Sequence, residues 1–298
     1  MDGPMDIRVL RYFLAAVRTG SISGAAEVLH VTQPTLSRQF IELEEELGHR
    51  LFVRTGRRLE LTPKGERFAE RARMIVDLFE RTRAEIRADN EMTGEVRIAA
   101  AETSAFAVLA RAACRLREEA PAVRLSVTSG NEEDVRRRLR AGVTDFGLFV
   151  GGADLSGLLT LRLPVCDRWG IVTPADGPFG RRTSVRADGL KGVPLICSSQ
   201  ATARSDLAGW MGGTAAFSTA AEYNLLNNAL VLAGEGLGHV LALDGIAGRH
   251  EGLVFVPLEP AVTAETVFVW DQNRTLGAPA ARFLELVRKE SELLNSRQ

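Results

Sequence analysis

The sequence lacks the features that mark secreted and membrane proteins. It contains three cysteines, Cys114, Cys166 and Cys197, an odd number without close spacing that fits a reducing compartment. No run of about 18 or more apolar residues is present, so no transmembrane helix is expected. The first residues carry Asp2 and Asp6 and no apolar run, which argues against a signal peptide and favours a cytoplasmic location.

The sequence also lacks an excess of positive or negative charge and a cluster of reactive side chains. The formal net charge is −1, which argues against a nonspecific nucleic-acid binder but leaves room for a small basic surface. The four histidines are scattered, and no two have metal-ligand spacing. No Ser/His/Asp or paired-carboxylate arrangement is evident. We therefore expect no metal, no cofactor and no enzymatic activity.

The length of 298 residues, with 45% hydrophobic residues, predicts two or three compact units with their own cores. A polar segment at 90–94 separates two regions with different hydrophobic patterns. The residues before it show helical periodicity, and the residues after it alternate between strand and helix patterns. We take this polar segment as the best domain boundary.

Three short helices are predicted at the start of the chain. The first covers 7–18, with an apolar stripe at helical spacing and Gly20 placed just past its end. Ser21 or Ser23 is suited to cap the second. Thr32 is suited to cap the third, which runs to about Leu47. Three short helices with a tight turn between the last two are typical of a helix-turn-helix.

A β-hairpin and a long helix are predicted next. Residues 51–53 and 59–61 alternate in hydrophobicity around a turn that contains Gly56, and in this context the hairpin is a wing. Thr62 and Pro63 open a helix that runs to about Asp89. Its apolar residues recur at steps of four and three, which predicts a dimerisation seam. The expected seam consists of Phe68, Ala72, Ile75, Phe79, Thr82 and Ile86.

The remainder of the chain is expected to be α/β. Strand patterns cover 96–100, 123–127, 145–150, 169–172, 195–196, 240–243 and 266–270. Helical patterns cover 106–119, 132–140, about 222–233 and about 278–294. Regular alternation of strand and helix predicts parallel sheets with right-handed crossovers. The pattern restarts after the third strand, so two α/β lobes are expected.

Several segments of the first 65 residues together resemble the LysR-type transcriptional regulators. They are Leu10–Leu14, Gly20–Ala26, Leu29–Gln39, Leu43–Gly48 and Leu51–Arg54. The run Thr62-Pro63-Lys64-Gly65 is similar to the start of that family's linker helix. The resemblance covers roughly residues 7 to 65 with almost no gap, whereas the rest of the chain matches in length and α/β pattern.

The resemblance implies a winged helix-turn-helix (1–62), a linker helix for dimerisation (63–90) and an effector-binding domain (91–298). That last domain is similar to periplasmic binding proteins. Lobe I is expected at about 91–164 and 267–298, and lobe II at about 165–266. The implied partners are double-stranded promoter DNA, further copies of the chain in a dimer or a dimer of dimers, and a small-molecule effector. Members of the family act as activators, repressors or both.

DNA contacts are predicted at the start of the third helix and on the wing. A recognition helix presents its N-terminal residues to the major groove. Glutamine can read adenine and arginine can read guanine, so Gln33 and Arg38 are the base-reading candidates. The other candidate contacts, mainly to phosphates, are Thr32, Pro34, Thr35, Ser37, Arg54, Arg57 and Arg58.

Effector contacts are predicted where strands end, because ligands in open α/β sheets bind at the carboxyl ends of strands. Thr103 and Ser104 lie just before a predicted helix, whose N-terminus is suited to an anion. Simple helix capping is the competing explanation for both hydroxyls. The other candidates by position are Ser129, Gly130, Asn131, Ser198, Ser199, Gln200 and Thr202.

Two alternative functions remain open at this stage. The first is a redox-sensing regulator of the same fold that uses Cys166 and Cys197, with Arg168 as the only hint of a lowered thiol pKa. The second is a solute-binding protein with an appended DNA-binding module, against which the helix-turn-helix and the expected lack of a signal peptide argue. The sequence identifies neither the effector nor the operator.

Overall fold

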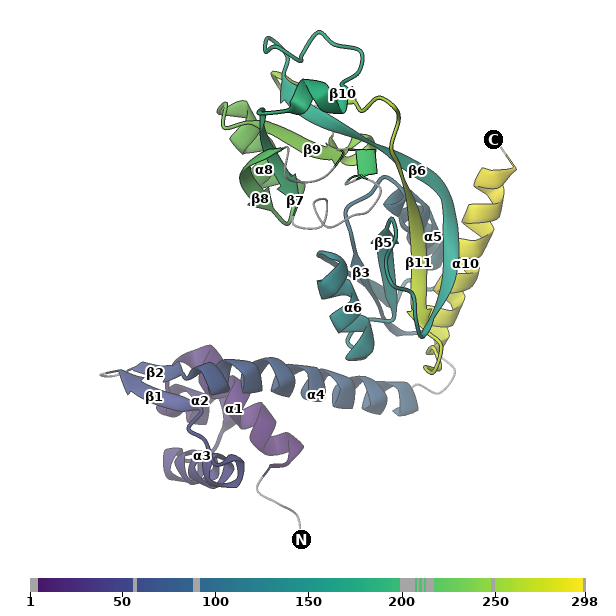
Figure 1. Ribbon diagram of the computed structural model, residues 1–298. Helices are drawn as coiled ribbons and strands as arrows, with labels where there is room; N and C mark the ends of the chain where they lie inside the picture. Colours follow the sequence, from purple (N-terminus) through teal and green to yellow (C-terminus); the bar gives the residue numbers. More distant parts are fainter. Residues whose placement is uncertain are drawn as a thin grey trace. The chain divides into compact units, whose positions relative to one another are not determined.

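The structure is a computed structural model that describes residues 5–55, 58–87, 92–198, 207, 209–210, 212, 217–247 and 250–296. Within these ranges the side chains of residues 54, 55, 58, 81, 84–87 and 247 lie outside the description. The chain forms two compact units, residues 1–89 and 90–298 (Figure 1). Among the described residues, no helix combines the length and the hydropathy needed to cross a membrane.

The first unit contains three short helices, a hairpin and a long helix. Its helices are α1 (Ile7–Thr19), α2 (Ile22–Leu29), α3 (Gln33–Leu47) and α4 (Pro63–Arg87). The hairpin consists of β1 (Phe52–Thr55) and β2 (Arg58–Leu61), paired antiparallel. The predicted helix-turn-helix, wing and long helix are therefore all present.

Local capping sets the ends of these helices. The Ser21 hydroxyl accepts a hydrogen bond from the Gly24 backbone N–H at 3.0 Å, so Ser21 rather than Ser23 caps α2. Thr32 caps α3 in the same way. Gly20 and Gly48 end α1 and α3 with φ of 66° and 65°, in the left-handed region that favours glycine.

A cluster of aromatic rings forms the centre of the first unit. The Phe13 side chain is fully buried. Its ring centroid lies 4.8 Å from that of Phe52 and 4.9 Å from that of Phe68. Phe40 on α3 approaches at 6.4 Å. Each ring comes from a different element, so this cluster joins α1, α3, the hairpin and α4.

The long helix α4 differs from the predicted dimerisation seam at its N-terminal end. Ala72 is fully buried and Phe68 packs on Phe13, so both belong to the core of their own unit. Ala72 is therefore removed from the predicted seam, whereas Phe68 is half-buried and stays a prediction. Further along α4, Ile75 and Phe79 expose 47% and 43% of their surface and stay candidates. Thr82 is also exposed, and the side chain of Ile86 lies outside the described residues.

A close approach of backbone explains why glycine stands at position 65. A Cβ on Gly65 would lie 2.0 Å from the Leu51 carbonyl oxygen and 2.9 Å from its carbon. The backbone of Leu51 is held in turn by the Thr62 N–H, which donates to the same carbonyl oxygen at 2.9 Å. Thus the N-terminus of α4 docks directly on the residue before the hairpin.

We expect Gly65→Ala to lower the free energy of unfolding of the first unit by about 1–3 kcal/mol, because the added methyl must displace backbone. Thermal unfolding followed by circular dichroism measures this loss. Gly20→Asn, at a left-handed position with open space around it, is the control and should cost less. Equal losses in the two variants would contradict the packing argument.

The second unit is built on a mixed sheet with the order β4-β3-β5-β11-β6-β9-β7-β8, with β10 also paired to β6. Its strands are β3 (Gly94–Ala100), β4 (Val123–Ser129), β5 (Phe146–Val150), β6 (Leu158–Pro174), β7 (Pro194–Ser198), β8 (Ser218–Tyr223), β9 (His239–Leu243), β10 (Leu253–Pro257) and β11 (Thr263–Asp271). Its helices are α5 (Phe106–Glu119), α6 (Glu132–Arg140), η1 (Ala187–Leu190), α8 (Leu226–Gly234), α9 (Asp244–Ala247) and α10 (Ala278–Asn295).

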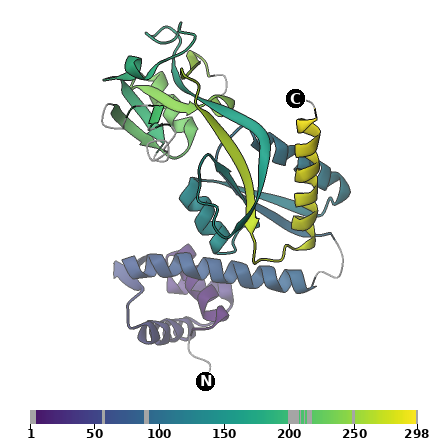
Figure 2. The same ribbon diagram turned by 45° about the vertical axis from the view of Figure 1, so that its right-hand side comes forward.

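Two long strands connect the two lobes of this unit. The first part of β6 pairs antiparallel with β11 (Figure 2). Further along β6, Trp169–Val172 pairs with β9 and Gly170–Pro174 pairs with β10. In lobe I, α5 and α10 cover one face of β3 and α6 covers the other. In lobe II, α8 packs against the sheet through Leu226, Ala229 and Leu230.

Three sequence predictions need correction in this unit. The sheet is mixed, because β5, β6, β9, β10 and β11 form antiparallel pairs as well. The strand expected at 169–172 is the end of a strand that begins at Leu158. The helix expected from about Glu222 begins at Leu226, and Ser218–Tyr223 is a strand.

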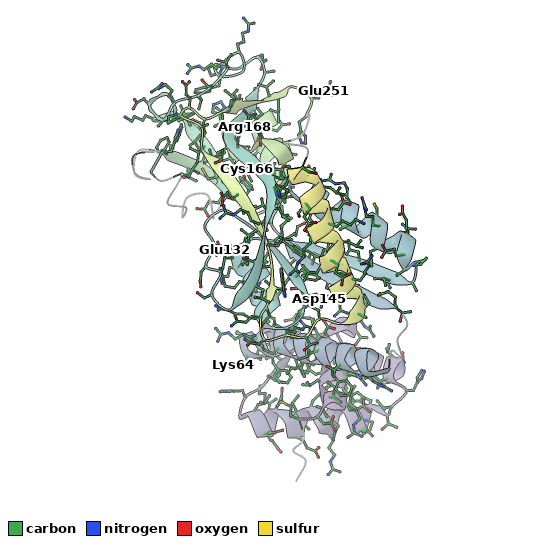
Figure 3. All side chains as sticks on the ribbon, turned by 90° about the vertical axis from the view of Figure 1, so that its right-hand side faces the viewer. Lys64, Glu132, Asp145, Cys166, Arg168 and Glu251 are labelled. Carbon is green, nitrogen blue, oxygen red and sulfur yellow. The ribbon has the colours of Figure 1, made fainter. Side chains whose placement is uncertain are left out.

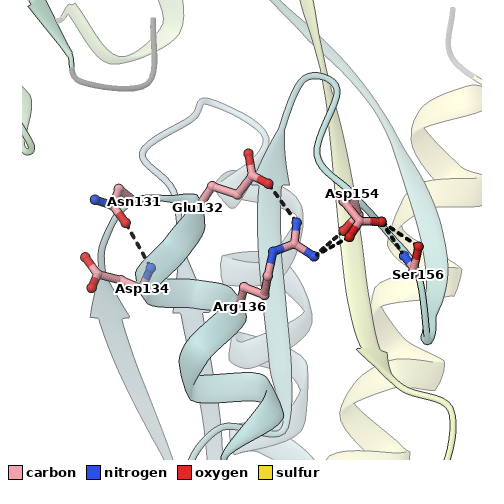
Figure 4. Close-up of polar contacts among 6 residues, drawn as sticks. All are labelled: Asn131, Glu132, Asp134, Arg136, Asp154 and Ser156. Atoms are coloured by element: carbon pink, nitrogen blue, oxygen red, sulfur yellow. Dashed lines mark hydrogen bonds and ion pairs between the residues drawn. The ribbon is translucent and has the colours of Figure 1, made fainter. Parts of the chain in front are cut away.

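An ion-pair network fixes α6 to the loop after β5. The Arg136 guanidinium lies 2.7 Å from a Glu132 carboxylate oxygen and 3.6 Å from an Asp154 carboxylate oxygen (Figure 4). It also lies over the Phe149 ring, 5.4 Å from the ring centroid. A hydrogen bond from the Ser156 hydroxyl is the largest of the interactions that lower the pKa of Asp154, followed by the Ser156 backbone N–H, and Arg136 adds to it. The network holds the N-terminal half of α6 beside β5.

Candidate nucleic-acid interface and interlobe cavity

The start of α3 presents a polar, exposed surface, as predicted. Gln33 and Thr35 are exposed in its first turn, while Leu36 and Phe40 point into the core. The Arg38 side chain is 81% exposed. Ser37 is half-buried and faces a groove between α3 and the hairpin. A helix N-terminus with exposed hydrogen-bonding side chains has the geometry for reading base edges.

Glu42 is a residue of this surface that the sequence did not single out. Its carboxylate accepts hydrogen bonds from Arg38 Nε at 2.8 Å and from Gln39 Nε2 at 2.9 Å. Arg38 keeps further N–H donors beyond Nε, since a guanidinium has five. Glu42 thus orients the Arg38 side chain. Spacing of i and i+4 on a helix is the sequence signal that could have found this pair.

The wing candidates fall outside the described side chains. Arg54 and Arg58 lie in β1 and β2, but their side chains are not described, and Arg57 lies wholly outside the described residues. Their predicted DNA contacts stay predictions. Thr32 and Pro34 are exposed at the start of α3.

The second unit contains a cavity of about 70 Å³ between its lobes. Ala101, Gly130 and Val150 contribute from the carboxyl ends of β3, β4 and β5 in lobe I. The full described wall is Ala101, Glu102, Gly130, Asn131, Val150, Trp169, Ser198, Tyr223, Asn224, Leu243 and Ile246. Carboxyl ends of strands from both lobes therefore meet at one cavity, as expected for a ligand site in an α/β protein.

The predicted effector residues divide into three groups. Gly130, Asn131 and Ser198 lie in the cavity wall. Ser129 is exposed and is not part of the described wall, and Thr103 and Ser104 are occupied by another side chain. The remaining candidates, Ser199, Gln200 and Thr202, lie outside the described residues.

Asp167 occupies the position that the sequence assigned to an effector anion. Its carboxylate is 1% exposed. It accepts hydrogen bonds from the Thr103 hydroxyl at 2.5 Å, from the Ser104 backbone N–H at 3.1 Å and from the Ser104 hydroxyl. Thr103 and Ser104 precede α5, so an internal carboxylate fills the anion site at this helix start. Both hydroxyls are engaged by Asp167, and the prediction that these two residues contact the effector stays a prediction.

Buried and exposed side chains alternate along β6, which explains why Asp167 is buried between two exposed neighbours. Cys166 and Arg168 flank Asp167 and are exposed, because successive side chains of a strand point to opposite faces (Figure 3). The Arg168 backbone N–H and Nε both donate to the Asp244 carboxylate, each at 2.9 Å. The guanidinium that hinted at a reactive Cys166 is thus engaged elsewhere.

The cysteines do not have the surroundings of a redox pair. Cys197 is buried, and burial, with a smaller effect of Glu222, raises the pKa of its thiol to about 11. At neutral pH such a thiol stays protonated, whereas the thiolate is the reactive form. Cys166 and Cys197 are both free thiols in the structure. The redox alternative therefore gains no support from either residue.

The exposed start of α3 in the first unit and the strand-end cavity in the second are the two candidate sites of the chain. Residues 7–66 match the family described as bacterial regulatory helix-turn-helix protein, lysR family. Residues 89–292 match the LysR substrate binding domain. The chain belongs to the LysR family of DNA-binding transcriptional regulators, a family that generally does not consist of enzymes.

Known relatives support the same assignment. The chain is 38% identical to the regulator ClcR of Pseudomonas putida over 144 residues, which cover 48% of this chain and 49% of ClcR. It is 29% identical to IlvY of Escherichia coli (strain K12) over 208 residues, covering 69% and 70% of the two chains. The aligned part thus spans about half the length of ClcR.

Solved structures share the fold over nearly the whole chain. The crystal structure of full-length CbnR complexed with its target DNA aligns with a TM-score of 0.72 at 23% identity. The alignment covers 96% of this chain and 100% of CbnR. At this identity the likeness concerns the fold alone.

Proposed function

We propose that the chain is a sequence-specific regulator that binds promoter DNA through α3 and responds to a small molecule held between its lobes. The observation that carries this proposal is the convergence of strand ends from both lobes on one cavity. The DNA-bound structure of CbnR, which has this fold, supports a role of the first unit in DNA binding. The chemistry of the cavity sets what the second unit recognises.

Base reading is assigned to Gln33 and Arg38. Both side chains are exposed at the start of α3 and point away from its apolar stripe. Arginine pairs with guanine and glutamine with adenine through two hydrogen bonds. The ion pair with Glu42 favours one orientation of Arg38, which reduces the side-chain entropy lost when Arg38 meets a base.

We expect Arg38→Ala to weaken binding to the operator by roughly 5- to 150-fold, the loss that corresponds to one base contact of about 1–3 kcal/mol. The operator is obtained by selecting duplexes bound by the full chain from a random-sequence pool. Gel shifts on the selected duplex then give the affinity of each variant.

Arg186→Ala is the matched control for this experiment. It removes the same charge from an exposed side chain of the second unit, so it should leave operator affinity almost unchanged. Unchanged affinity in Arg38→Ala, or an equal loss in the control, rules out base reading by Arg38. Arg38→Ala should also relax base preference at one operator position, which a second round of selection measures.

A dimer is proposed through the exposed face of α4. Ile75, Leu78 and Phe79 expose 47%, 45% and 43% of their surface and form an apolar patch on this helix. Large apolar side chains exposed together are typical of a protein interface. A second copy of α4 is the proposed partner, and two-fold symmetry of the selected operator would support it.

A further inference from the structure

Three helices begin next to residues of the cavity wall, and side chains of the chain already bind donors at or just before each helix start. The first is α5, where the buried Asp167 carboxylate accepts hydrogen bonds from Thr103 and Ser104. These donors are the groups that would otherwise hold an anionic ligand at a helix N-terminus. An effector carboxylate at this position would have to displace Asp167.

The second helix start is α8, and its cap comes from the opposite lobe. The Leu226 backbone N–H donates to Glu102 Oε2 at 2.8 Å. Glu102 directly follows β3 of lobe I, whereas α8 belongs to lobe II, so this hydrogen bond crosses the cavity region. Among the described residues, no other side chain caps the α8 N-terminus. Glu102 therefore lines the cavity and also accepts a hydrogen bond that joins the two lobes.

The third helix start is α6, where the chain provides negative charge of its own. Asn131 Oδ1 accepts a hydrogen bond from the Asp134 N–H at 2.9 Å and caps the helix. Its first turn carries Glu132, Glu133 and Asp134. Acidic side chains at this position favour the helix but repel an incoming anion.

The described cavity wall has one carboxylate and no cationic side chain. The Tyr223 hydroxyl donates to the Leu241 carbonyl oxygen at 2.8 Å. Burial raises the pKa of Tyr223 well above its ordinary value, and Cys197 and Glu102 add to this shift, so the phenol stays neutral. Glu102 is then the single formal charge among the described wall residues.

The remaining wall is largely apolar and the space is small. Val150, Trp169, Leu243 and Ile246 supply hydrocarbon and aromatic surface. The volume of about 70 Å³ is well below the roughly 150 Å³ that accommodates benzene in an engineered cavity. A short aliphatic ligand fits this space better than an aromatic acid.

We propose that the effector of this chain is a small aliphatic amine, bound as its ammonium form with Glu102 as counter-ion, rather than a small carboxylate. This inference rests on the proposed function, since it assigns the ligand class of the same cavity. A carboxylate has two oxygens with about four acceptor positions. Glu102 therefore has acceptor capacity beyond its bond to Leu226, whereas an anionic ligand meets this carboxylate and helix starts whose nearby donors already bind side chains of the chain.

The test compares matched amines and carboxylates on the full chain. Methylammonium, ethylammonium and propylammonium are compared with formate, acetate and propionate at pH 7 and constant ionic strength. We expect the amines to raise the thermal midpoint of the second unit as their concentration increases, by mass action. The carboxylates should have no effect beyond that of an equal concentration of chloride.

Glu102→Gln separates ligand binding from nonspecific stabilisation. It should weaken the binding of the amine at least tenfold, while Glu118→Gln, at an exposed position of α5, should leave it unchanged. If Glu102→Gln does not fold, Glu102→Asp keeps the charge and should keep the preference for amines. Stabilisation by carboxylates, amine binding that persists in Glu102→Gln, or no stabilisation by any amine each overturns the proposal.

Operator gel shifts distinguish this outcome from a failure of the proposed function. A carboxylate that changes operator affinity would leave ligand-responsive regulation in place and refute the amine class alone. Failure to select any DNA sequence with the full chain would refute the proposed function, whatever the ligand class. An amine that binds and changes operator affinity through Glu102 supports both.

Discussion

Replacing Phe13 with alanine should lower the free energy of unfolding of the first unit by about 3–5 kcal/mol, the usual cost of removing a fully buried phenyl ring. The ring is fully buried and has aromatic neighbours from three other elements, Phe40, Phe52 and Phe68. The cavity would lie between α1, α3, the hairpin and α4, so no single element can move to fill it. A loss of this size approaches the total stability of many small domains.

The distribution of tryptophan makes this loss measurable in the full chain. All three tryptophans, Trp169, Trp210 and Trp270, belong to the second unit. Tryptophan fluorescence therefore follows unfolding of the second unit, whereas far-ultraviolet circular dichroism follows the helices of both. In Phe13→Ala the urea midpoint seen by dichroism should fall, and the midpoint seen by fluorescence should not.

The control is Ile41→Ala on α3, because Ile41 is 55% exposed. Trimming an exposed side chain usually changes stability by no more than about 0.5 kcal/mol. Comparable losses in the two variants would show that the aromatic cluster does not form the centre of the unit. An equal shift of the fluorescence transition would show that the two units do not unfold independently.

Elements bounded by local signals were predictable from the sequence. The caps Ser21 and Thr32 and the left-handed Gly20 and Gly48 act within one turn of their helices, so the residues on either side suffice to locate them. The same holds for α5 and α6, whose bounds match the predicted ranges. Local hydrogen bonds and periodicity decide such elements regardless of the rest of the fold.

Elements that depend on distant partners were less predictable. The first part of β6 carries Pro164 and exposed polar residues, and its pairing partner β11 lies about a hundred residues further on. The dimerisation seam predicted on α4 was uncertain for the same reason, because it depends on residues far away in the sequence. Periodicity identifies an apolar face, but it cannot tell that Phe68 packs within its own unit while Ile75 stays exposed.

The candidate site was predictable in position but not in chemistry. The rule that ligands bind at strand ends located Gly130, Asn131 and Ser198 in the cavity wall. It could not show that Asp167, 63 residues away from Ser104, would supply the anion at the start of α5. A carboxylate between two exposed residues of a strand gives no local sign of its partner.

Replacing Asp167 with alanine should lower the free energy of unfolding of the second unit by about 3 kcal/mol. The variant loses three hydrogen bonds to a charged acceptor, each worth about 1.5–3 kcal/mol. It also removes the desolvation cost of the buried carboxylate, which offsets part of that loss. Asp167→Asn keeps the shape and one oxygen acceptor, so it should cost less. Tryptophan fluorescence during urea unfolding measures both losses, with Asp176→Ala at an exposed turn as control.

The loss in Asp167→Ala should be reversible by an added anion. Removing the carboxymethyl group leaves the Thr103 hydroxyl and the Ser104 N–H and hydroxyl without their acceptor at the start of α5. Formate or acetate can fill that space and accept the same hydrogen bonds, supported by the helix dipole. Formate should therefore raise the midpoint of Asp167→Ala but not that of the unsubstituted chain, with chloride at equal ionic strength as reference.

Full stability in Asp167→Ala, or a loss that neither anion relieves, would show that Asp167 does not occupy an anion site. Rescue would show that this helix start keeps the capacity for anions and that the chain's own carboxylate excludes them.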